Sequence, residues 1–209
     1  MADYSKQIWD YFMEKIGNSY GVAGLMGNLQ AESGLCPYRV QGDFTNGWTY
    51  SIDYTAKVDS GEISENDFVN NGPNGGGYGL CQWTFWSRKQ NLYNKWKSGG
   101  YSSIGSIELA LDFLWQELNS NYTGVRDDLI NATSIRDASD SVLLNFERPA
   151  DQSESVQELR ASLGQNWYDM YHTSEPDPEP DPEPDPEPSP SKKKGLSIVM
   201  MYLASRKVV

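Results

Sequence analysis

Residues 24–34 read GLMGNLQAESG, and this stretch decides how the rest of the chain is interpreted. Apolar residues in and just before it recur at helical spacing, and four of them share one face: Val22, Leu25, Met26 and Leu29. Ser33 and Gly34 close the helix, because glycine readily adopts the left-handed conformation in which many helices end. The pattern predicts a helix with an apolar face whose last turn carries one carboxyl group, that of Glu32.

Glu32 is poorly placed for the stability of that helix, since the C-terminal end of a helix dipole repels negative charge. An isolated glutamate in such a position is most often an ordinary solvated residue. Beside the apolar neighbours Leu29 and Leu35, however, a half-buried carboxyl group would hold its proton to higher pH than a solvated one. A carboxyl group of that kind suits general-acid catalysis.

A second motif lies further on, where residues 76–84 read GGYGLCQWT. The glycines predict a close-packed strand or turn, and this turn carries a polar amide and a large aromatic ring. Three further motifs follow the same order along the chain: YTAKVDSG at 54–61, FLWQEL at 113–118 and FERPAD at 146–151. With QAESGL at 30–35, these motifs make the chain from about residue 3 to 173 resemble the phage tail lysozyme family. Its members are peptidoglycan hydrolases related to the goose-type lysozyme and lytic transglycosylase fold.

Helical periodicity predicts five more helices, at residues 3–16, 86–97, 106–118, 134–146 and 153–172. The helix at 106–118 is the best candidate for a buried central helix. Between residues 36 and 77 the periodicity fades, which predicts loops and short strands. The resemblance implies that a small β lobe in this region faces the catalytic helix across a cleft. The predicted fold class is therefore α+β, mainly α.

The composition divides the chain into a lysozyme-like domain at 1–173, a linker at 174–191 and a tail at 192–209. The linker alternates acidic residues with proline, which predicts an extended, disordered spacer without a core. The tail carries five basic residues and an apolar run too short to span a bilayer. It is interpreted as a membrane-surface anchor, as a docking peptide for a partner such as a phage tail protein, or as the start of a further domain.

The first 173 residues carry 22 acidic and 12 basic side chains, so this domain is a poor candidate for nucleic-acid binding. The first five residues lack the basic and apolar regions of a secretory signal. Together with the resemblance, this indicates a protein of the virion tail, or one held in the host cytoplasm before release. A lysis enzyme and a hydrolase of a conjugative element are both consistent with the sequence.

The resemblance implies cleavage of the β-1,4 glycosidic bond between N-acetylmuramic acid and N-acetylglucosamine, with Glu32 as the general acid. Asp43 is the first candidate for a second carboxylate that holds the attacking water, and Asp53 and Asp59 are its rivals. For Asp43 a turn-forming role is the simpler interpretation. Without such a carboxylate, the 6-hydroxyl of the sugar attacks instead, and the enzyme is a lytic transglycosylase that releases 1,6-anhydro products.

The residues expected to bind the glycan come from both motifs and from the region between them. The resemblance implies that Gln82 and Tyr78 bind the saccharide and orient the acid. Trp83 either stacks on a sugar or packs in the interior, and packing is favoured. Trp48 and Tyr54 are candidates for a sugar-binding wall, because flat rings stack on sugar rings.

Two other functional classes remain open. A cysteine peptidase would need Cys36 or Cys81 with His172, but this only histidine stands at the far end of the domain. A sugar-binding module would need no catalytic residue, so Glu32→Gln would cost it little. No cofactor or metal is expected, since one histidine and two scattered cysteines do not make a closed zinc site. The two cysteines are either disulfide-bonded or free buried thiols.

Overall fold

The structure is a computed structural model that describes residues 3–71 and 76–172. All of these residues belong to one compact unit, Met1–Glu175. The predicted linker at 174–191 and tail at 192–209 lie outside the described residues.

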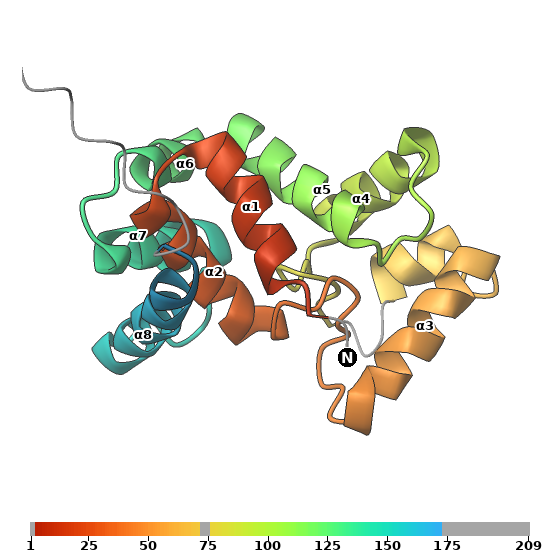
Figure 1. Ribbon diagram of the computed structural model, residues 1–209. Coiled ribbons are helices and arrows are strands. Elements are labelled where there is room, and N and C mark those ends of the chain that lie inside the picture. The colour runs from red at the N-terminus through yellow and green to blue at the C-terminus, as the bar shows by residue number, and fades with distance from the viewer. Residues whose placement is uncertain (1–2, 72–75, 173–209) are drawn as a thin grey trace, which may run out of the picture. The chain divides into compact units, whose positions relative to one another are not determined.

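The described residues form a mainly helical domain (Figure 1). Its α-helices are α1 (Ser5–Ile16), α2 (Ser19–Ser33), α3 (Thr49–Ser60), α4 (Trp86–Gly99), α5 (Ile107–Ser120), α6 (Thr123–Ile130), α7 (Ile135–Ser141) and α8 (Glu154–Tyr171). Three short helical turns join them: η1 (Asn46–Trp48), η2 (Asp67–Asn71) and η4 (Val142–Glu147). The five helices predicted from periodicity are confirmed as α1, α4, α5, α7 with η4, and α8.

The helix at the centre of this arrangement is α2, which packs against α1, α6, α7 and α8 (Figure 1). Its residues from Gly21 to Leu29 are all buried, so the helix is covered on every side. The sequence prediction that residues 106–118 form a buried helix is confirmed by α5. The prediction that this helix is the central one is wrong, because α2 and not α5 is the helix around which the others pack.

Glycines let the backbones of the neighbouring helices approach α2 closely. A Cβ atom added at Gly21 would lie 2.1 Å from the carbonyl oxygen of Leu129 in α6. One added at Gly24 would lie 2.6 Å from the backbone nitrogen of Ser139 in α7. A Cβ atom at Gly27 would likewise lie 2.2 Å from the carbonyl oxygen of Arg160 in α8. Glycines spaced three residues apart therefore each allow one of the helices α6, α7 and α8 to approach α2.

We expect Gly24→Ala to lower the free energy of unfolding by about 1–3 kcal/mol, because the added methyl group must push α7 away from α2. Gly124→Ala is the matched control, since nothing lies within 4 Å of a Cβ atom at that position of α6. This control should be neutral or stabilise the protein by up to about 1 kcal/mol, as alanine favours a helix. Urea denaturation of both variants measures the difference; equal stabilities would contradict the close-packing account.

The small β lobe predicted between residues 36 and 77 is not confirmed. Within the described part of the chain, β structure is limited to two isolated bridges, which pair Tyr78 with Val40 and with Trp83. The helix α3 occupies part of the region where strands were expected. Its buried face includes Ser51 and Thr55, so a polar buried face concealed the helical period that an apolar one would have revealed.

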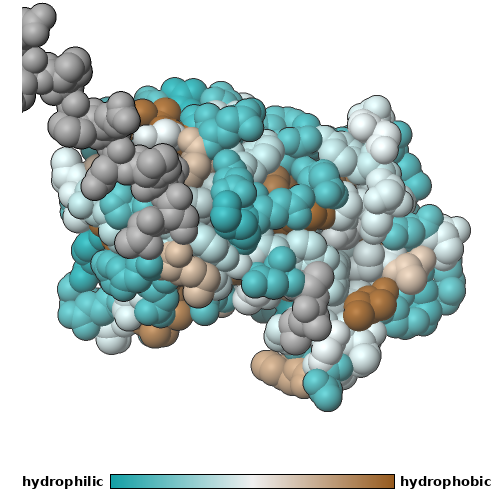
Figure 2. Space-filling model, in the orientation of Figure 1, coloured by the Kyte–Doolittle hydropathy of each residue, from teal (hydrophilic) through white to brown (hydrophobic). Residues whose placement is uncertain are grey.

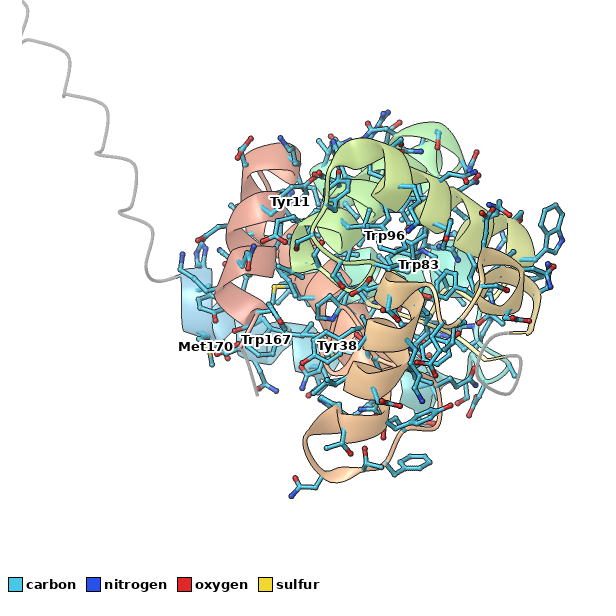
Figure 3. All side chains as sticks on the ribbon, turned by 90° about the vertical axis from the view of Figure 1, so that its right-hand side faces the viewer. Tyr11, Tyr38, Trp83, Trp96, Trp167 and Met170 are labelled. Carbon is cyan, nitrogen blue, oxygen red and sulfur yellow. The ribbon has the colours of Figure 1, made fainter. Side chains whose placement is uncertain are left out.

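Most aromatic side chains of the described residues lie in the core or pack against it. Trp83 and Trp96, labelled in Figure 3, are at most 6% exposed, and Trp83 packs edge-on against Phe113. The surface seen in Figure 2 is mostly hydrophilic, with its apolar residues scattered. Among the described residues, the exposed aromatic side chains include Phe85 and Trp86 at the start of α4.

Candidate active site

Glu32 lines an open cleft at the C-terminal end of α2, with a volume of about 400 Å³. The cleft is formed by segments far apart in the sequence: the end of α2, the turn at 81–85, the start of α4 and the end of η4. Its lining residues are Glu32, Gln41, Cys81, Gln82, Thr84, Phe85, Arg88, Glu147, Arg148 and Pro149. Of the sequence-predicted site residues, Glu32 and Gln82 lie here.

A polar network fixes the orientation of Glu32. Arg160 of α8 donates a hydrogen bond to Oε1 of Glu32 at 2.6 Å and a second to Oδ1 of Asn28 at 3.0 Å. The side-chain amide of Asn28 in turn donates to the carbonyl oxygen of Ser139 at 3.1 Å. The Glu32 side chain is 19% exposed and that of Arg160 is 8% exposed. Glu32 therefore has an ion-pair partner, largely shielded from water, which the sequence did not predict.

Glu147 is a second carboxylic acid in the same cleft. It is the last residue of η4, which ends where Arg148 takes the left-handed conformation and donates its N–H to the carbonyl oxygen of Leu143 at 2.8 Å. Oε1 of Glu147 is buried and has no hydrogen-bond partner among the described residues. Burial raises the pKa of Glu147 well above its usual range, and the negative charge of Glu32 raises it further.

Beneath the cleft, Arg88 forms a bidentate ion pair with the buried carboxylate of Glu117, and both of its hydrogen bonds measure 2.7 Å. The indole N–H of Trp83 donates to the same carboxylate at 2.8 Å. Trp83 is fully buried and therefore packs in the interior, as favoured from the sequence, and does not stack on a sugar. The ion pair anchors α4 to α5 and so supports the floor of the cleft.

Gln82 is held in a strained conformation beside Glu32. Its φ angle is 47°, and its side-chain amide donates to the carbonyl oxygens of Arg39 and Gly79 at 3.1 and 3.0 Å. A Cβ atom at Gly77 would lie 2.7 Å from the carbonyl oxygen of Gln82, so glycine is needed for this turn to close. The glycine-rich motif thus presents Gln82 to the cleft in one fixed orientation.

Positive φ angles outside glycine occur, among the described residues, at Leu35, Trp48, Gln82 and Arg148. Gln82 and Arg148 line the Glu32 cleft, while Leu35 and Trp48 line a second pocket at the same end of α2. Backbone strain of this kind costs on the order of 1–3 kcal/mol per residue and is concentrated at functional sites. Its distribution makes the end of α2 a candidate functional region.

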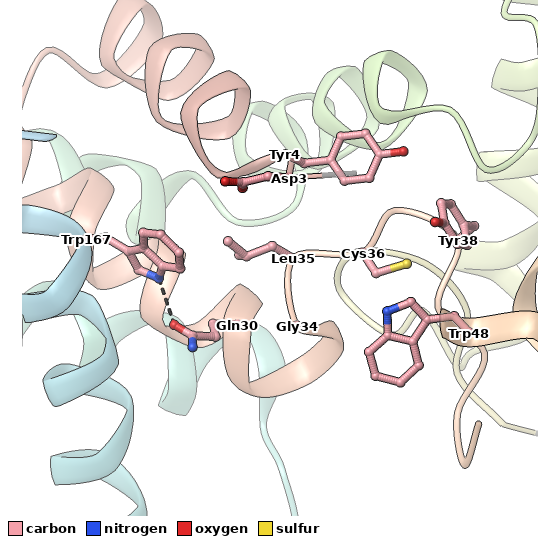
Figure 4. A pocket seen from close by; sticks show the side chains of 9 residues that line it. All are labelled: Asp3, Tyr4, Gln30, Gly34, Leu35, Cys36, Tyr38, Trp48 and Trp167. Atoms are coloured by element: carbon pink, nitrogen blue, oxygen red, sulfur yellow. Dashed lines mark hydrogen bonds between the residues drawn. The ribbon is translucent and has the colours of Figure 1, made fainter. Parts of the chain in front are cut away.

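The second pocket has a volume of about 220 Å³ and is rich in aromatic residues (Figure 4). Trp167 closes one side of it and donates its indole N–H to Oε1 of Gln30 at 2.8 Å. Trp48 lies opposite, with the guanidinium of Arg39 3.2 Å from the centre of its ring. The indole nitrogen of Trp48 is buried, lacks a described hydrogen-bond partner and points toward Cys36 in Figure 4. Trp48 therefore lines a pocket, but not the cleft that contains Glu32.

Tyr54 and Tyr78 do not line either pocket. Tyr78 is 1% exposed, and its hydroxyl group lies 2.8 Å from that of Thr55. Tyr54 is also buried and packs against the ring of Tyr78. The expectation that these tyrosines contact the glycan is not supported, because both side chains belong to the core beneath α3.

Asp43 lies outside the cleft, in a hydrogen-bonded turn that fits the simpler, turn-forming interpretation better than the catalytic one. Its side chain is buried outside the cleft and accepts hydrogen bonds from the N–H groups of Thr45 and Ser51, both at 2.9 Å, and from their hydroxyl groups. Burial acts to raise the pKa of Asp43, but the hydrogen bonds from Ser51 and Thr45 outweigh it and hold the pKa well below its usual range. The rivals also lie elsewhere: Asp53 pairs with Lys57, and Asp59 binds Ser103.

We expect Asp43→Asn to lower the free energy of unfolding at neutral pH by about 1.5–3 kcal/mol, because an amide nitrogen then faces a hydrogen-bond donor. The lowered pKa stabilises the wild-type fold above the ordinary carboxyl range near pH 3.9, so the difference should shrink as the pH falls below it. Urea denaturation at several pH values measures this. Asp53→Asn, on the exposed face of α3, is the control, and loss of activity by well-folded Asp43→Asn would contradict the assignment.

The cysteines do not form a peptidase site. Cys36 and Cys81 are free, buried thiols, and burial raises the pKa of each, which disfavours the reactive thiolate. His172 follows α8, where its ring stacks on Tyr168 at 4.3 Å, and it lines neither pocket that contains a cysteine. The possible disulfide is likewise absent from the structure.

Two features of the cleft were not identified from the sequence. Glu147 directly follows the helix predicted at 134–146 and so stands at a helix end, as Glu32 does; this shared position was the available signal. Phe85 lines the cleft with 72% of its surface exposed, and Trp86 beside it is 64% exposed. No local pattern distinguishes these rings from the many aromatic residues of the core.

The described residues contain no cluster of three or more side chains suited to binding a metal ion. Within the same residues, every helix is too short or too polar to cross a membrane.

Comparison with known proteins identifies a family for this chain. A family model described as phage tail lysozyme matches residues 3–171, which covers nearly all of the described domain and both walls of the cleft. No curated protein matches the chain.

Proposed function

The chain belongs to the phage tail lysozyme family, and on this premise we propose that it cleaves the β-1,4 glycosidic bond between N-acetylmuramic acid and N-acetylglucosamine in peptidoglycan. The family suggests lysozyme-like degradation of peptidoglycan in a phage setting. The specific bond and the residues that act on it are our assignment.

One observation carries this assignment: a fixed carboxyl group opens onto a cleft at the end of the central helix. Glu32 is held by Arg160 through one oxygen, Oε1, while no described residue bonds the other oxygen, Oε2. Glycoside cleavage needs a carboxyl group that delivers a proton to the leaving oxygen. We assign this general-acid role to Glu32.

A second candidate function is lytic transglycosylation. Asp43 is buried outside the cleft, and of the carboxylates proposed from the sequence only Glu32 lines it. The other carboxyl group in the cleft is that of Glu147, and its raised pKa makes it a poor base for activating a water molecule. Both facts favour attack by the sugar's own 6-hydroxyl, which needs no carboxylate to position a water molecule. The product would then carry a 1,6-anhydro ring.

The glycan contacts are assigned to residues that face the cleft. The carbonyl oxygen of the Gln82 side chain remains available to accept a hydrogen bond from the sugar, since its amide nitrogen is already bonded. Phe85 offers an exposed ring on which a sugar can stack. A glycan that continues past the end of α2 would reach Trp48 in the second pocket.

Mass spectrometry of the soluble fragments released from purified peptidoglycan tests the function. Fragments ending in reducing N-acetylmuramic acid are expected for hydrolysis, and fragments lighter by one water molecule are expected for the transglycosylase route. Cut peptide stems with intact glycan strands would contradict both and point to a peptidase. Binding to peptidoglycan without release of any soluble fragments would indicate a non-catalytic sugar-binding module.

The biological setting remains a proposal of the same kind. We assign the protein to the virion tail or to lysis of the host, acting on the bacterial wall from either side. The contacts proposed for residues 192–209, with phage tail proteins or with a membrane surface, lie outside the described residues.

A further inference from the structure

We propose that Glu32 and Glu147 act as a carboxyl pair that shares one proton, and that Glu147 is the positioning residue that keeps this proton in the cleft at neutral pH. This inference rests on the proposed function, since it explains how the general acid stays supplied with a proton. It assigns a role to a carboxyl group that the glycosidase mechanism has not otherwise used.

The geometry of the cleft supports a shared proton. Glu32 and Glu147 line the same cavity from two helix ends, those of α2 and η4. Glu32 is bound to Arg160 at 2.6 Å, so in the resting cleft it is the charged member of the pair. Oε1 of Glu147 is buried without a described partner, which is costly for a charged oxygen but much less so for a protonated carboxyl group.

Charged and titratable groups face Glu147 from every element around it. They are Glu32 of α2, Cys81 of the glycine-rich turn, Arg88 of α4, Glu117 of α5, the next residue Arg148, and Arg160 of α8. The two arginines that oppose protonation are already engaged, Arg88 with Glu117 and Arg160 with Glu32. Burial and the charge of Glu32 therefore prevail and raise the pKa of Glu147.

Such a pair can keep a proton available for the reaction at neutral pH. A solvated glutamic acid loses its proton above about pH 4.3 and then cannot act as an acid. Two carboxylates in one cleft repel each other, so the last proton leaves the pair only at higher pH. The pair then has one proton and one negative charge when the glycan binds.

The proton balance closes over one turnover. The proton of the pair passes through Glu32 to the glycosidic oxygen, which keeps the electron pair of the broken C1–O bond. A hydroxyl group, from water or from the sugar's own 6-position, forms the new bond to C1. Its released proton returns to the pair, which has carried two negative charges in between. Arg160 and Arg88 stabilise that doubly charged state.

The pH profile of kcat/KM for Glu147→Gln tests the proposal. An uncharged amide no longer opposes ionisation of Glu32, so the alkaline limb should move at least one pH unit lower. Activity at pH 7 should fall about tenfold or more, and at acidic pH it should approach the wild-type value. Glu147→Asp should return the alkaline limb part of the way to its wild-type pH. Glu158→Gln changes an exposed residue of α8 and should leave the limb at the wild-type pH.

Two outcomes would overturn the proposal. A wild-type pH profile in Glu147→Gln would mean that the residue only packs, and an equal loss at every pH would mean that it acts in another way. If Glu147→Gln does not fold, infrared spectroscopy of the wild-type protein decides: a protonated carboxyl band is expected at pH 7, and its absence would refute the shared proton. This band does not depend on activity, so it separates failure of the pair from failure of the glycosidase assignment.

Discussion

Replacing Glu32 by glutamine is expected to lower the rate of glycan cleavage by about 10²–10⁴-fold, which is the usual contribution of a general acid. Glutamine has the same shape but holds no transferable proton. Its side-chain oxygen can still accept the hydrogen bond from Arg160, so the fold and the affinity for glycan should be nearly unchanged. Dye release from labelled peptidoglycan measures the rate, and co-sedimentation with insoluble peptidoglycan measures binding.

Glu158→Gln provides the matched control for this experiment, because it makes the same chemical change on an exposed surface of α8. It should retain the wild-type rate. A Glu32→Gln protein that cleaves glycan within a few fold of wild type would remove Glu32 from the reaction and with it the general-acid assignment.

Replacing Arg160 by methionine is expected to lower the free energy of unfolding by about 3–5 kcal/mol. The change leaves the carboxylate of Glu32 shielded from water without its partner, and it removes the hydrogen bond to Oδ1 of Asn28. Part of the loss should be recovered in the double variant Arg160→Met with Glu32→Gln, since the unpaired charge is then gone. Urea denaturation of the single and double variants measures this coupling.

The control for Arg160 is Arg126→Met, because Arg126 pairs at the surface with Asp127, whose side chain is 57% exposed. Surface ion pairs contribute at most about 1 kcal/mol, so this variant should be close to wild type. If Arg160→Met were equally close to wild type, or if the double variant recovered nothing, the network around Glu32 would not be a source of stability.

The helices were largely predictable because most of them have an apolar face with a helical period. The end of α2 was predictable as well, since Gly34 and the position of Glu32 are local signals. By contrast, α3 was missed because polar residues occupy buried positions on it, and the short helix α6 was not predicted at all. The central role of α2 follows from its glycines, whose effect depends on helices distant in the sequence.

The candidate site was predictable only where a residue's role depends on its own helix or turn. Arg160 stands 128 positions from Glu32, and no local pattern connects them. Asp43 was a candidate second carboxylate because it follows the helix of Glu32, but the hydroxyl groups of Thr45 and Ser51 bind it in the interior, as a turn-forming role implies. Tyr78 was expected in the cleft because of its motif, yet its side chain is buried in the core, while its backbone pairs with Val40 and Trp83.

The most direct test of the account is a crystal structure of Glu32→Gln with a bound tetrasaccharide of alternating N-acetylglucosamine and N-acetylmuramic acid. We expect the oligosaccharide in the cleft lined by Gln82 and Glu147, with a glycosidic oxygen about 2.6–3.2 Å from the side-chain amide at position 32. A sugar chain confined to the pocket of Trp48 and Trp167, with no glycosidic bond near position 32, would contradict the central claim that this carboxyl group cleaves the glycan.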